Sequence, residues 1–275
     1  MGRARHAAGV PSTGVAGPGP ANLVEIFSSI QGEGPHVGAR TLFVRFGECD
    51  LRCRWCDSPH TWRPAVHCEI ELEAGSGRRA RVANPVPLDA VVAAAERLEV
   101  GRHRFVSLTG GEPLLQPDAV AAVARELRAR GPRVLLETHG LAEAALARVV
   151  DAIDVVSMDW KLASDVRRAS DPARGPVPEF HDAHERFLRA ALGAPEIVVK
   201  IVVTPASGDA EIDEACARVA RTAPRATLVL QPVTPCGAVR ERPSAQRLLD
   251  LAVRASRVCA DVRVIPQTHP IYGVP

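Results

Sequence analysis

Three cysteines near the start of the chain have the spacing of metal-cluster ligands. Cys49, Cys53 and Cys56 form a C-x3-C-x2-C pattern within eight residues. Iron–sulfur clusters are held by cysteine thiolates and normally need four of them, yet no fourth cysteine follows at regular spacing. A [4Fe–4S] cube held at three irons leaves one iron for another ligand, much as catalytic zinc sites keep one open position. The triplet therefore indicates an enzyme with a catalytic cluster.

A structural zinc site is the main alternative interpretation of these cysteines. Cys53 and Cys56, together with His67 and Cys68, supply four ligands of the types that zinc prefers. This assignment leaves Cys49 unused and crosses an irregular segment that contains prolines, so we favour the cluster. The corresponding functional alternative is a non-enzymatic, zinc-stabilised α/β binding module.

Length, composition and charge set broad limits on the class of protein. The 275 residues are enough for one large domain with a substantial core. The formal charge is +2, and no basic block with interleaved aromatics is present, so nucleic acid is not an expected partner. Neither a membrane span nor a signal peptide is visible, and we expect a cytoplasmic protein. Residues 1–20 are rich in Gly, Ala and Pro and are expected to be a disordered extension before a domain at 21–275.

Strand-like and helix-like segments alternate along the domain. Apolar runs predict strands over 41–46, 104–108, 133–137, 154–158, 197–203, 227–230 and 262–265. Apolar residues recur with helical spacing over 88–98, 120–127 and 248–255. This alternation predicts parallel strands with crossover helices, as in a barrel or a doubly wound sheet. Residues 59–85 break the rhythm and are expected to form an irregular surface insertion after the cysteine loop.

Polar motifs follow the predicted strands at their carboxyl ends. Thr109-Gly-Gly-Glu-Pro113 follows the second strand, Thr138-His-Gly140 the third, Asp159-Trp-Lys161 the fourth and Gln231-Pro232 the sixth. Catalytic groups of α/β barrels gather at this face. The pattern is independent of the cysteines and also predicts an enzyme.

Through these motifs, the chain resembles the radical S-adenosylmethionine (SAM) superfamily. The cysteine triplet, Trp55 before its last cysteine and the glycine-rich motif at 109–113 carry this resemblance. More narrowly, the chain resembles the 7-carboxy-7-deazaguanine synthases, from the pathway to queuosine and other deazapurines. The residues that carry the narrower resemblance are Glu25–Gly34, Gly38, Phe43, Arg45, Cys49–Ser58, Glu137–Gly140, Ser157, Asp159, Lys161, Gln231, Pro232 and Gln267–His269. The chain departs from that family at His139, where Asn is usual, and at Ser58, where Thr is usual.

The resemblance implies the fold and the reaction. The fold would be α/β, a partial (β/α)6-type barrel of the radical SAM class with an N-terminal strand and loop extension. SAM would bind the open iron of the [4Fe–4S] cluster, and one electron would cleave it to a 5′-deoxyadenosyl radical. The substrate would be 6-carboxy-5,6,7,8-tetrahydropterin, converted to 7-carboxy-7-deazaguanine with loss of ammonia by a carbon–nitrogen lyase. Beyond the cluster and the cofactor radical, no catalytic side chain is expected.

The resemblance also assigns binding residues. Those expected at SAM are Trp55, Asp57, Gly110, Gly111, Glu137, Thr138, Ser157, Lys161, Gln231, Pro232, Val233 and Thr234. Those expected at the substrate are Ile30, Gln31, Gly32, Glu33, Arg45, Thr109 and Pro275. Arg45 would hold the substrate carboxylate through its guanidinium. Ser58 would offer its hydroxyl to a Mg2+ ion near that carboxylate.

The remaining expectations concern the partners of the protein and a second candidate function. Besides the pterin, the resemblance implies an electron donor such as a flavodoxin or ferredoxin, and a homodimer, but neither nucleic acid nor a membrane. A radical SAM activase, which installs a glycyl radical on a partner protein, would share the cluster and the Gly-Gly-Glu motif. It would not need Gln31–Gly34 or Arg45. His181 and His184 have i, i+3 spacing and are expected on an exposed helix face.

Overall fold

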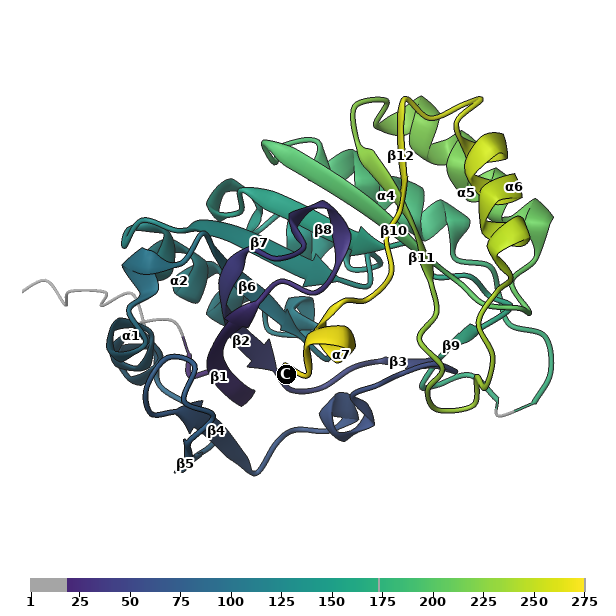
Figure 1. Cartoon of the computed structure of the whole chain (residues 1–275). Coiled ribbons are helices and arrows are strands. Elements are labelled where there is room, and N and C mark those ends of the chain that lie inside the picture. Colours follow the sequence, from purple (N-terminus) through teal and green to yellow (C-terminus); the bar gives the residue numbers. More distant parts are fainter. Residues whose placement is uncertain (1–18, 173, 275) are drawn as a thin grey trace, which may run out of the picture.

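Most strands of the chain pair into one mixed sheet in the computed structural model, which describes residues 19–172 and 174–274 (Figure 1). The strands are β1 Leu23–Ile30, β2 Arg40–Phe46, β3 Leu51–Cys53, β4 His67–Glu71, β5 Arg79–Ala83, β6 Phe105–Gly110, β7 Arg133–Thr138, β8 Val155–Asp159, β9 Val166–Arg168, β10 Glu196–Val203, β11 Thr227–Pro232 and β12 Asp261–Val264. The large sheet has ten strands in the order β12-β11-β10-β8-β7-β6-β2-β1-β4-β5, and β3 pairs separately with β9. The extension expected over 1–20 lies outside the described residues, except for its last two.

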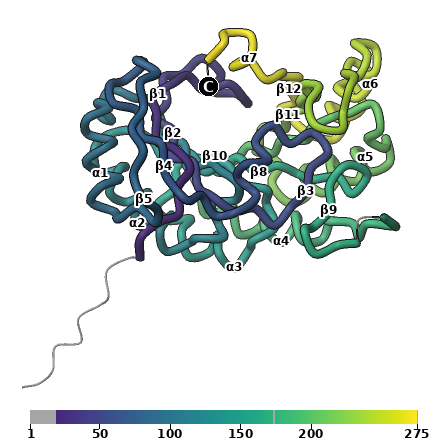
Figure 2. The backbone as a smooth tube through the Cα atoms, turned by 90° about the horizontal axis from the view of Figure 1, so that it is seen from below, coloured from purple at the N-terminus to yellow at the C-terminus, as the bar shows by residue number. Residues whose placement is uncertain are grey.

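Helices connect these strands. They are α1 Leu88–Arg97, α2 Pro117–Arg128, α3 Glu143–Leu146, α4 His181–Ala191, α5 Asp209–Thr222, α6 Ala245–Ala255 and α7 His269–Tyr272. Figure 2 shows α1 to α6 around the outside of the curved sheet, with α7 between β1 and β12. The helical patterns at 88–98, 120–127 and 248–255 coincide with α1, α2 and α6. In the described part of the chain, no helix has the length and apolar character needed to cross a membrane.

The parallel part of the sheet consists of the strands that the apolar runs predict. Strands β2, β6, β7, β8, β10, β11 and β12 run parallel to their neighbours. β1 joins β2 in antiparallel orientation and forms the N-terminal strand extension. The sheet ends at β12 on one side and at β5 on the other, so the barrel is partial. The predicted α/β fold is confirmed.

Side chains alternate between the two faces of the parallel strands, and this alternation separates the core from the site. Successive side chains of a strand point to opposite faces, and the outer residues pack with the helices in the main core. On the inner face, an apolar floor consists of Phe105, Leu135, Val155, Val198 and Val229. Two positions further along the same five strands stand Ser107, Glu137, Ser157, Lys200 and Gln231. The inner face therefore changes from apolar to polar towards the carboxyl ends of the strands.

The segment 59–85 is more regular than expected. After a 3-10 turn at Pro59–Trp62, it forms the β4–β5 hairpin, which pairs with β1 and extends the sheet. Cys68 and Ile70 are buried on alternate positions of β4. The expectation of an irregular segment is wrong here, because an apolar signal of only two residues is too short to stand out among polar neighbours.

His181 and His184 are buried on α4, so the expectation of an exposed helix face is wrong. The indole Nε1 of Trp160 donates to His181 Nδ1 at 3.0 Å. His184 Nε2 accepts from the backbone N–H of Lys161 at 2.8 Å, and its Nδ1 donates to the Gly140 carbonyl at 2.8 Å. These partners fix the neutral tautomer with the proton on Nδ1. The imidazole thereby holds together the segments that follow β7 and β8.

The variant His184→Gln is expected to reduce the pH dependence of stability. Burial lowers the pKa of His184 to about 3 from an ordinary value of 6.5. Between these values the unfolded chain binds the extra proton, so the free energy of unfolding falls as the pH drops. For the wild type we expect this group to cost about 2 kcal/mol between pH 6.5 and pH 5, a loss that the variant avoids. Urea unfolding at several pH values measures it.

Replacement of the exposed His67 by Gln is the matched control for this experiment. It should leave the slope of stability against pH unchanged. An equal slope in His184→Gln and the wild type would show that His184 is not held neutral in the folded protein.

Candidate active site

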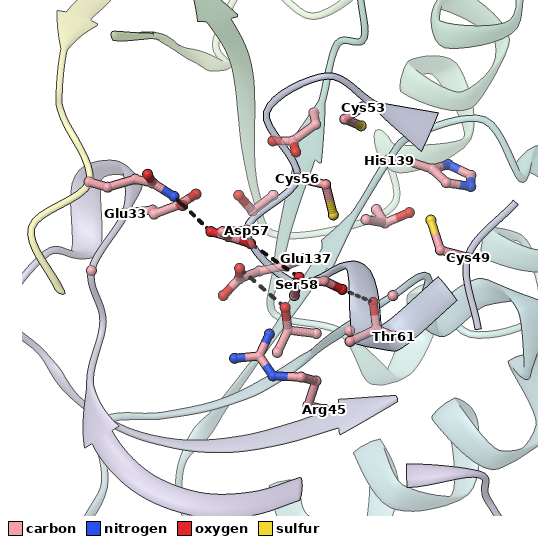
Figure 3. A pocket seen from close by; sticks show the side chains of 18 of the residues that line it. Glu33, Arg45, Cys49, Cys53, Cys56, Asp57, Ser58, Thr61, Glu137 and His139 are labelled. Carbon is pink, nitrogen blue, oxygen red and sulfur yellow. Dashed lines mark hydrogen bonds between the residues drawn. The ribbon is translucent and has the colours of Figure 1, made fainter. Parts of the chain in front are cut away.

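A cavity of about 430 Å³ lies at the carboxyl ends of the parallel strands (Figure 3). Figure 3 shows the thiols of Cys49, Cys53 and Cys56 around a common space, with Glu33 and Arg45 across from them. The predicted site residues that line this cavity are Ile30, Gln31, Gly32, Glu33, Arg45, Cys49, Cys53, Trp55, Cys56, Asp57, Ser58, Thr109, Gly110, Gly111, Glu137, Thr138, Ser157, Lys161 and Gln231. Residues from many separate segments of the sequence thus meet in one recess.

Four predicted residues are not among those described as lining this cavity. Pro232 ends β11, and Val233 is buried in a small cluster against the ring of Trp55. Thr234 follows them in the loop after β11. Their contact with SAM stays a prediction, and the structure places Val233 behind a side chain that lines the cavity. Pro275 lies outside the described residues.

The cysteine loop is tied down on both sides by backbone contacts. Strand β3, which ends at Cys53, pairs with β9. The Arg54 N–H donates to the Asp165 carbonyl at 3.1 Å, and the Arg54 carbonyl accepts from the Ala238 N–H at 2.7 Å. A Cβ on Gly237 would lie 2.6 Å from that same carbonyl oxygen, so the loop after β11 approaches the cysteine loop as closely as glycine permits. These contacts fix the direction of the cysteine side chains.

The three thiols face one cavity, as ligands of a single iron–sulfur cluster would. Burial raises the pKa of Cys49 to about 12 and also raises the pKa of Cys53. Such thiols keep their protons until a cation replaces them, and iron binds the thiolate form. Within 19–172 and 174–274, no three His, Cys, Asp or Glu side chains form a group that could hold one metal ion. Cys68 lies in the main core instead of joining Cys53 and Cys56, so the alternative zinc site does not form.

The glycine-rich motif packs directly against the start of the cysteine loop. A Cβ on Gly110 would lie 2.7 Å from the carbonyl oxygen of Phe46. A Cβ on Gly111 would overlap the carbonyl oxygen of Glu48 and lie 2.8 Å from its carbonyl carbon. The N–H of Glu112 donates to that same Glu48 oxygen at 2.7 Å. Both glycines therefore allow β6 and the cysteine loop to touch through their backbones.

The buried carboxylate of Glu112, which has no predicted role, connects this motif to β7. It accepts from the Thr138 hydroxyl at 2.8 Å and from the N–H groups of Leu114 and His139 at 3.0 and 2.8 Å. His139 Nε2 in turn donates to Asp50 at 2.9 Å. His139 thus reaches the residue beside the first cysteine.

Glu137 stands between the residues expected at SAM and those expected at the substrate. Its Oε1 accepts from Gln31 Nε2 at 2.9 Å and from the Ser107 hydroxyl at 2.7 Å. Its Oε2 accepts from the Thr109 hydroxyl at 3.4 Å. Gln31 and Thr109 are both predicted substrate residues, so Glu137 positions them from the neighbouring strand.

Arg45 is held in the cavity wall by an ion pair that the sequence did not reveal. Its Nε donates to Glu25 Oε1 at 2.7 Å, and Arg79 of the β4–β5 hairpin pairs with the other oxygen of Glu25. Both guanidinium groups lie over the ring of Phe27, at 5.9 and 5.2 Å from its centre. Phe27 itself stacks on Phe43. Arg45 uses its Nε for Glu25, so its other N–H groups can still bind an anion in the cavity.

Four charged side chains form a continuous network on the opposite wall; Lys200 is buried and the other three are half-buried. Lys200 pairs with Glu33 and, at 3.0 Å, with Asp159; Asp159 pairs with Lys161 at 2.6 Å. Burial opposes the charge on each group, but the neighbours of opposite sign outweigh it. The pKa of Asp159 is lowered to about 2 and that of Glu33 is also lowered, whereas the pKa values of Lys161 and Lys200 are raised. All four groups are charged at neutral pH and their charges cancel.

The segment before the C-terminus closes one side of the cavity. Gln267 Nε2 donates to Glu33 at 2.7 Å and to Asp57 at 3.3 Å. The N–H of Thr268 donates to the Gly32 carbonyl at 2.8 Å, and Gln267 and His269 line the cavity. The C-terminal segment therefore touches both the substrate side and the cysteine loop.

Two polar groups have the chemistry needed for absent ligands. Within the described residues, Gln231 Oε1 is buried without a hydrogen-bond partner, so it can accept from an N–H group of a bound molecule. The hydroxyl of Ser58 lies 3.1 Å from the carboxylate of Asp57, which gives two adjacent oxygens of the kind that Mg2+ prefers. The cavity residues fit the predicted cofactors.

Several residues that line the cavity were not given a role by the sequence. They are Glu25, Phe27, Phe43, Leu51, His60, Thr61, Trp62, His139, Asp159, Lys200, Val202, Gln267 and His269. For Lys200, one signal was available, because a lone charge interrupts the apolar run over 197–203. A charged side chain in a fully buried strand needs a partner, so that position already pointed to a polar site.

Comparisons with known proteins agree with the motifs. The model of the Radical SAM superfamily matches residues 44–219. Curated 7-carboxy-7-deazaguanine synthases from Geobacter sulfurreducens and Methanopyrus kandleri are 38% and 37% identical over 257 and 270 residues. The first alignment covers 92% of this chain and 97% of the relative, and the second covers 91% and 92%.

Solved structures support the fold. QueE from Escherichia coli aligns with a TM-score of 0.57 at 23% identity, over 91% of this chain and 94% of that one. TYW1 with a lysine-pyruvate adduct bound aligns with a TM-score of 0.53 at 12% identity, over 81% and 76%. The fold is shared with these structures, and the family model over 44–219 assigns it to the radical SAM class.

Proposed function

Because the chain belongs to the radical SAM superfamily and, within it, to the 7-carboxy-7-deazaguanine synthases, we propose that it converts 6-carboxy-5,6,7,8-tetrahydropterin to 7-carboxy-7-deazaguanine with loss of ammonia. It is thus a carbon–nitrogen lyase of queuosine-type biosynthesis. The observation that carries this proposal is that one cavity holds the cysteine triplet together with Arg45 and Glu33. A glycyl-radical activase would have no need for such a site for a small anion.

The side chains around the cavity divide the work of binding. When bound, the cluster and SAM would supply one-electron radical chemistry. Cys49, Cys53 and Cys56 would hold the cluster, and the unpaired Gln231 oxygen would accept from SAM. Arg45, already fixed by Glu25, would direct its remaining N–H groups to the substrate carboxylate.

The opposite wall would bind the ring system of the substrate. Glu33 is ionised and would accept N–H groups of the pterin, while Gln31 and Thr109, held by Glu137, would supply further hydrogen bonds. The recess and the C-terminal segment exclude water, which protects a reactive radical from side reactions. The protein thus contributes orientation and shielding, and the cofactor contributes the chemistry.

Removal of Mg2+ is expected to slow the reaction while the iron content of the protein stays unchanged. We propose that Ser58 and Asp57 hold Mg2+ beside the substrate carboxylate. Ser58→Ala removes one ligand of the hydrated ion. It should therefore raise the Mg2+ concentration needed for half-maximal activity by about tenfold. Titration of chelator-treated protein with Mg2+ measures this, and iron analysis is the control. An unchanged Mg2+ requirement would exclude Ser58 as a ligand.

We also propose the remaining partners that the resemblance implies. A flavodoxin or ferredoxin would reduce the cluster, and a cytoplasmic location would keep its thiolates reduced. The protein would form a homodimer. Sedimentation of the purified protein tests the last of these proposals.

Anaerobic turnover tests the proposed function directly. The protein would be reconstituted with iron and sulfide and incubated with SAM, dithionite, Mg2+ and 6-carboxytetrahydropterin, with mass-spectrometric detection of 7-carboxy-7-deazaguanine. Product without any partner protein supports the proposal and excludes the activase. Cleavage of SAM to 5′-deoxyadenosine without product would keep the superfamily and overturn the substrate. A colourless protein with one tightly bound zinc would overturn both.

A further inference from the structure

The two lysines of this chain stand out by composition and by place. Of its 34 basic residues, Lys161 and Lys200 are lysines and the other 32 are arginines (34 − 2). Both lysines line the cavity, and both belong to the network with Glu33 and Asp159. A chain that otherwise builds its cations from arginine uses an ammonium group at these two positions. The site therefore favours a compact point charge over a planar fork.

The surroundings of Lys200 explain this preference. It projects from the middle of β10 on the inner face, between the apolar neighbours Val198 and Val202. Its single nitrogen contacts Glu33 on one side and Asp159 on the other. As a compact point charge, this nitrogen bonds two carboxylates that lie in different directions.

We propose that Lys200 is a positioning residue for substrate recognition: its ammonium, anchored by Asp159, holds the Glu33 carboxylate towards the pterin. This inference rests on the proposed function, because it assigns the role of a residue in the same cavity. Gln267 supplies the other hydrogen bond to Glu33, but it lies on the C-terminal segment rather than on the sheet. Lys200 thus connects Glu33 to the rigid part of the fold.

The charges predict which binding step suffers when Lys200 is lost. In Lys200→Met, the network changes from neutral to a net charge of −1, and Glu33 loses its cation. Asp159 retains Lys161 at 2.6 Å, so the side of the network nearest the cysteine loop stays paired; Lys161 also lies 5.7 Å from the ring centre of Trp55. Substrate binding should therefore weaken more than SAM binding.

Steady-state kinetics of Lys200 variants test the proposal. Lys200→Met should raise KM for the pterin by about tenfold or more, with less than about threefold change in KM for SAM, as expected when one buried contact is removed. The ratio of 5′-deoxyadenosine to product should rise by a similar factor, because misaligned substrate leaves the radical unused. Lys200→Arg should not restore the wild-type values, whereas Arg189→Lys, on the exposed face of α4, should change none of them.

A merely structural role would give a different pattern. The proposal is overturned if the full-length Lys200→Met variant keeps the wild-type KM for the pterin and the wild-type ratio of 5′-deoxyadenosine to product. Full rescue by Lys200→Arg would also overturn it. If Lys200→Met does not fold, Lys200→Arg and Glu33→Gln supply the same comparison. Glu33→Gln should raise KM for the pterin, and adding Lys200→Arg to it should raise KM by less than about twofold, since the pair acts as one unit.

A second readout separates this inference from the proposed function. A double-mutant cycle on urea unfolding, with Lys200→Met and Glu33→Gln, measures their contact without any substrate. If the wild type cleaves SAM but makes no deazaguanine, the proposed function fails while the cycle still reports the contact. If the wild type makes product and the cycle shows no coupling, the positioning role of Lys200 fails alone.

Discussion

Cys53→Ala is expected to abolish the iron–sulfur cluster and, with it, product formation. Cys53 ends β3, and its half-buried side chain lines the cavity with Cys49 and Cys56. The cluster already relies on only three thiolates, so the two that remain in the variant cannot hold it. The loss of activity should exceed about a hundredfold, the upper range for residues that only support a metal ligand. Iron analysis, electron paramagnetic resonance and detection of 5′-deoxyadenosine measure this loss.

Cys236→Ala is the matched control, because Cys236 lies close to the same loop but outside the triplet. Its thiol donates to the Cys56 carbonyl at 3.6 Å. A variant that keeps the cluster and the activity would confine the ligands to the three motif cysteines. Equal loss of iron in Cys236→Ala and Cys53→Ala would instead indicate a fourth thiolate, and the open iron needed for SAM would then be missing.

The parallel strands could be predicted from the sequence because they are buried on both faces. A strand such as β10, with the run Glu196–Val203, shows an apolar signal long enough to be recognised without its neighbours. The β4–β5 hairpin could not be recognised, since its charged residues form ion pairs across strands, such as Arg81 with Glu69. β4 depends on pairing with β1, and β5 on pairing with β4, contacts that no local pattern records.

The parts of the site that could be predicted are those where a sequence motif follows a parallel strand. The cysteine loop and the glycine motif are far apart in sequence, but both follow parallel strands, and the carboxyl ends of such strands converge. Partners within the site could not be predicted in this way. Nothing local links Glu33 to Lys200 or Glu25 to Arg79, because each pair forms only after the sheet has assembled. The sequence predicted that Arg45 contacts the substrate, but only the structure reveals its ion pair with Glu25.

The prediction for His181 and His184 failed for a related reason. Polar residues with helical spacing usually mark a solvated face, yet here the helix buries both rings beneath the ends of β7 and β8. His184 bonds the backbone groups of Lys161 and Gly140, and His181 accepts from the indole of Trp160. No sequence pattern reveals these partners. Buried histidines are identified by the hydrogen bonds available to them, which depend on tertiary structure.

Gly111→Ala is expected to disable the enzyme through backbone overlap. The added methyl group would overlap the Glu48 carbonyl oxygen and lie 2.8 Å from its carbon, and neither atom belongs to a flexible side chain. The start of the cysteine loop must then move away from β6, which breaks the hydrogen bond from Glu112 to Glu48. Overpacking of this kind costs about 1–3 kcal/mol of stability. Activity should fall by about a hundredfold, as for a misplacement of about 1 Å near reacting groups.

Gly193→Ala separates this overlap from the general effect of adding a methyl group. A Cβ at Gly193 would make ordinary contacts, the nearest at 3.6 Å to a side-chain carbon of Val150, so stability and turnover should change little. For Gly111→Ala, the iron content after reconstitution locates the damage. Low iron would mean that the displaced loop no longer presents its cysteines, whereas full iron with weak SAM binding would place the fault at the cofactor. Wild-type turnover in Gly111→Ala would show that the cysteine loop can yield without loss of function, contrary to the close backbone packing from which its rigidity is inferred.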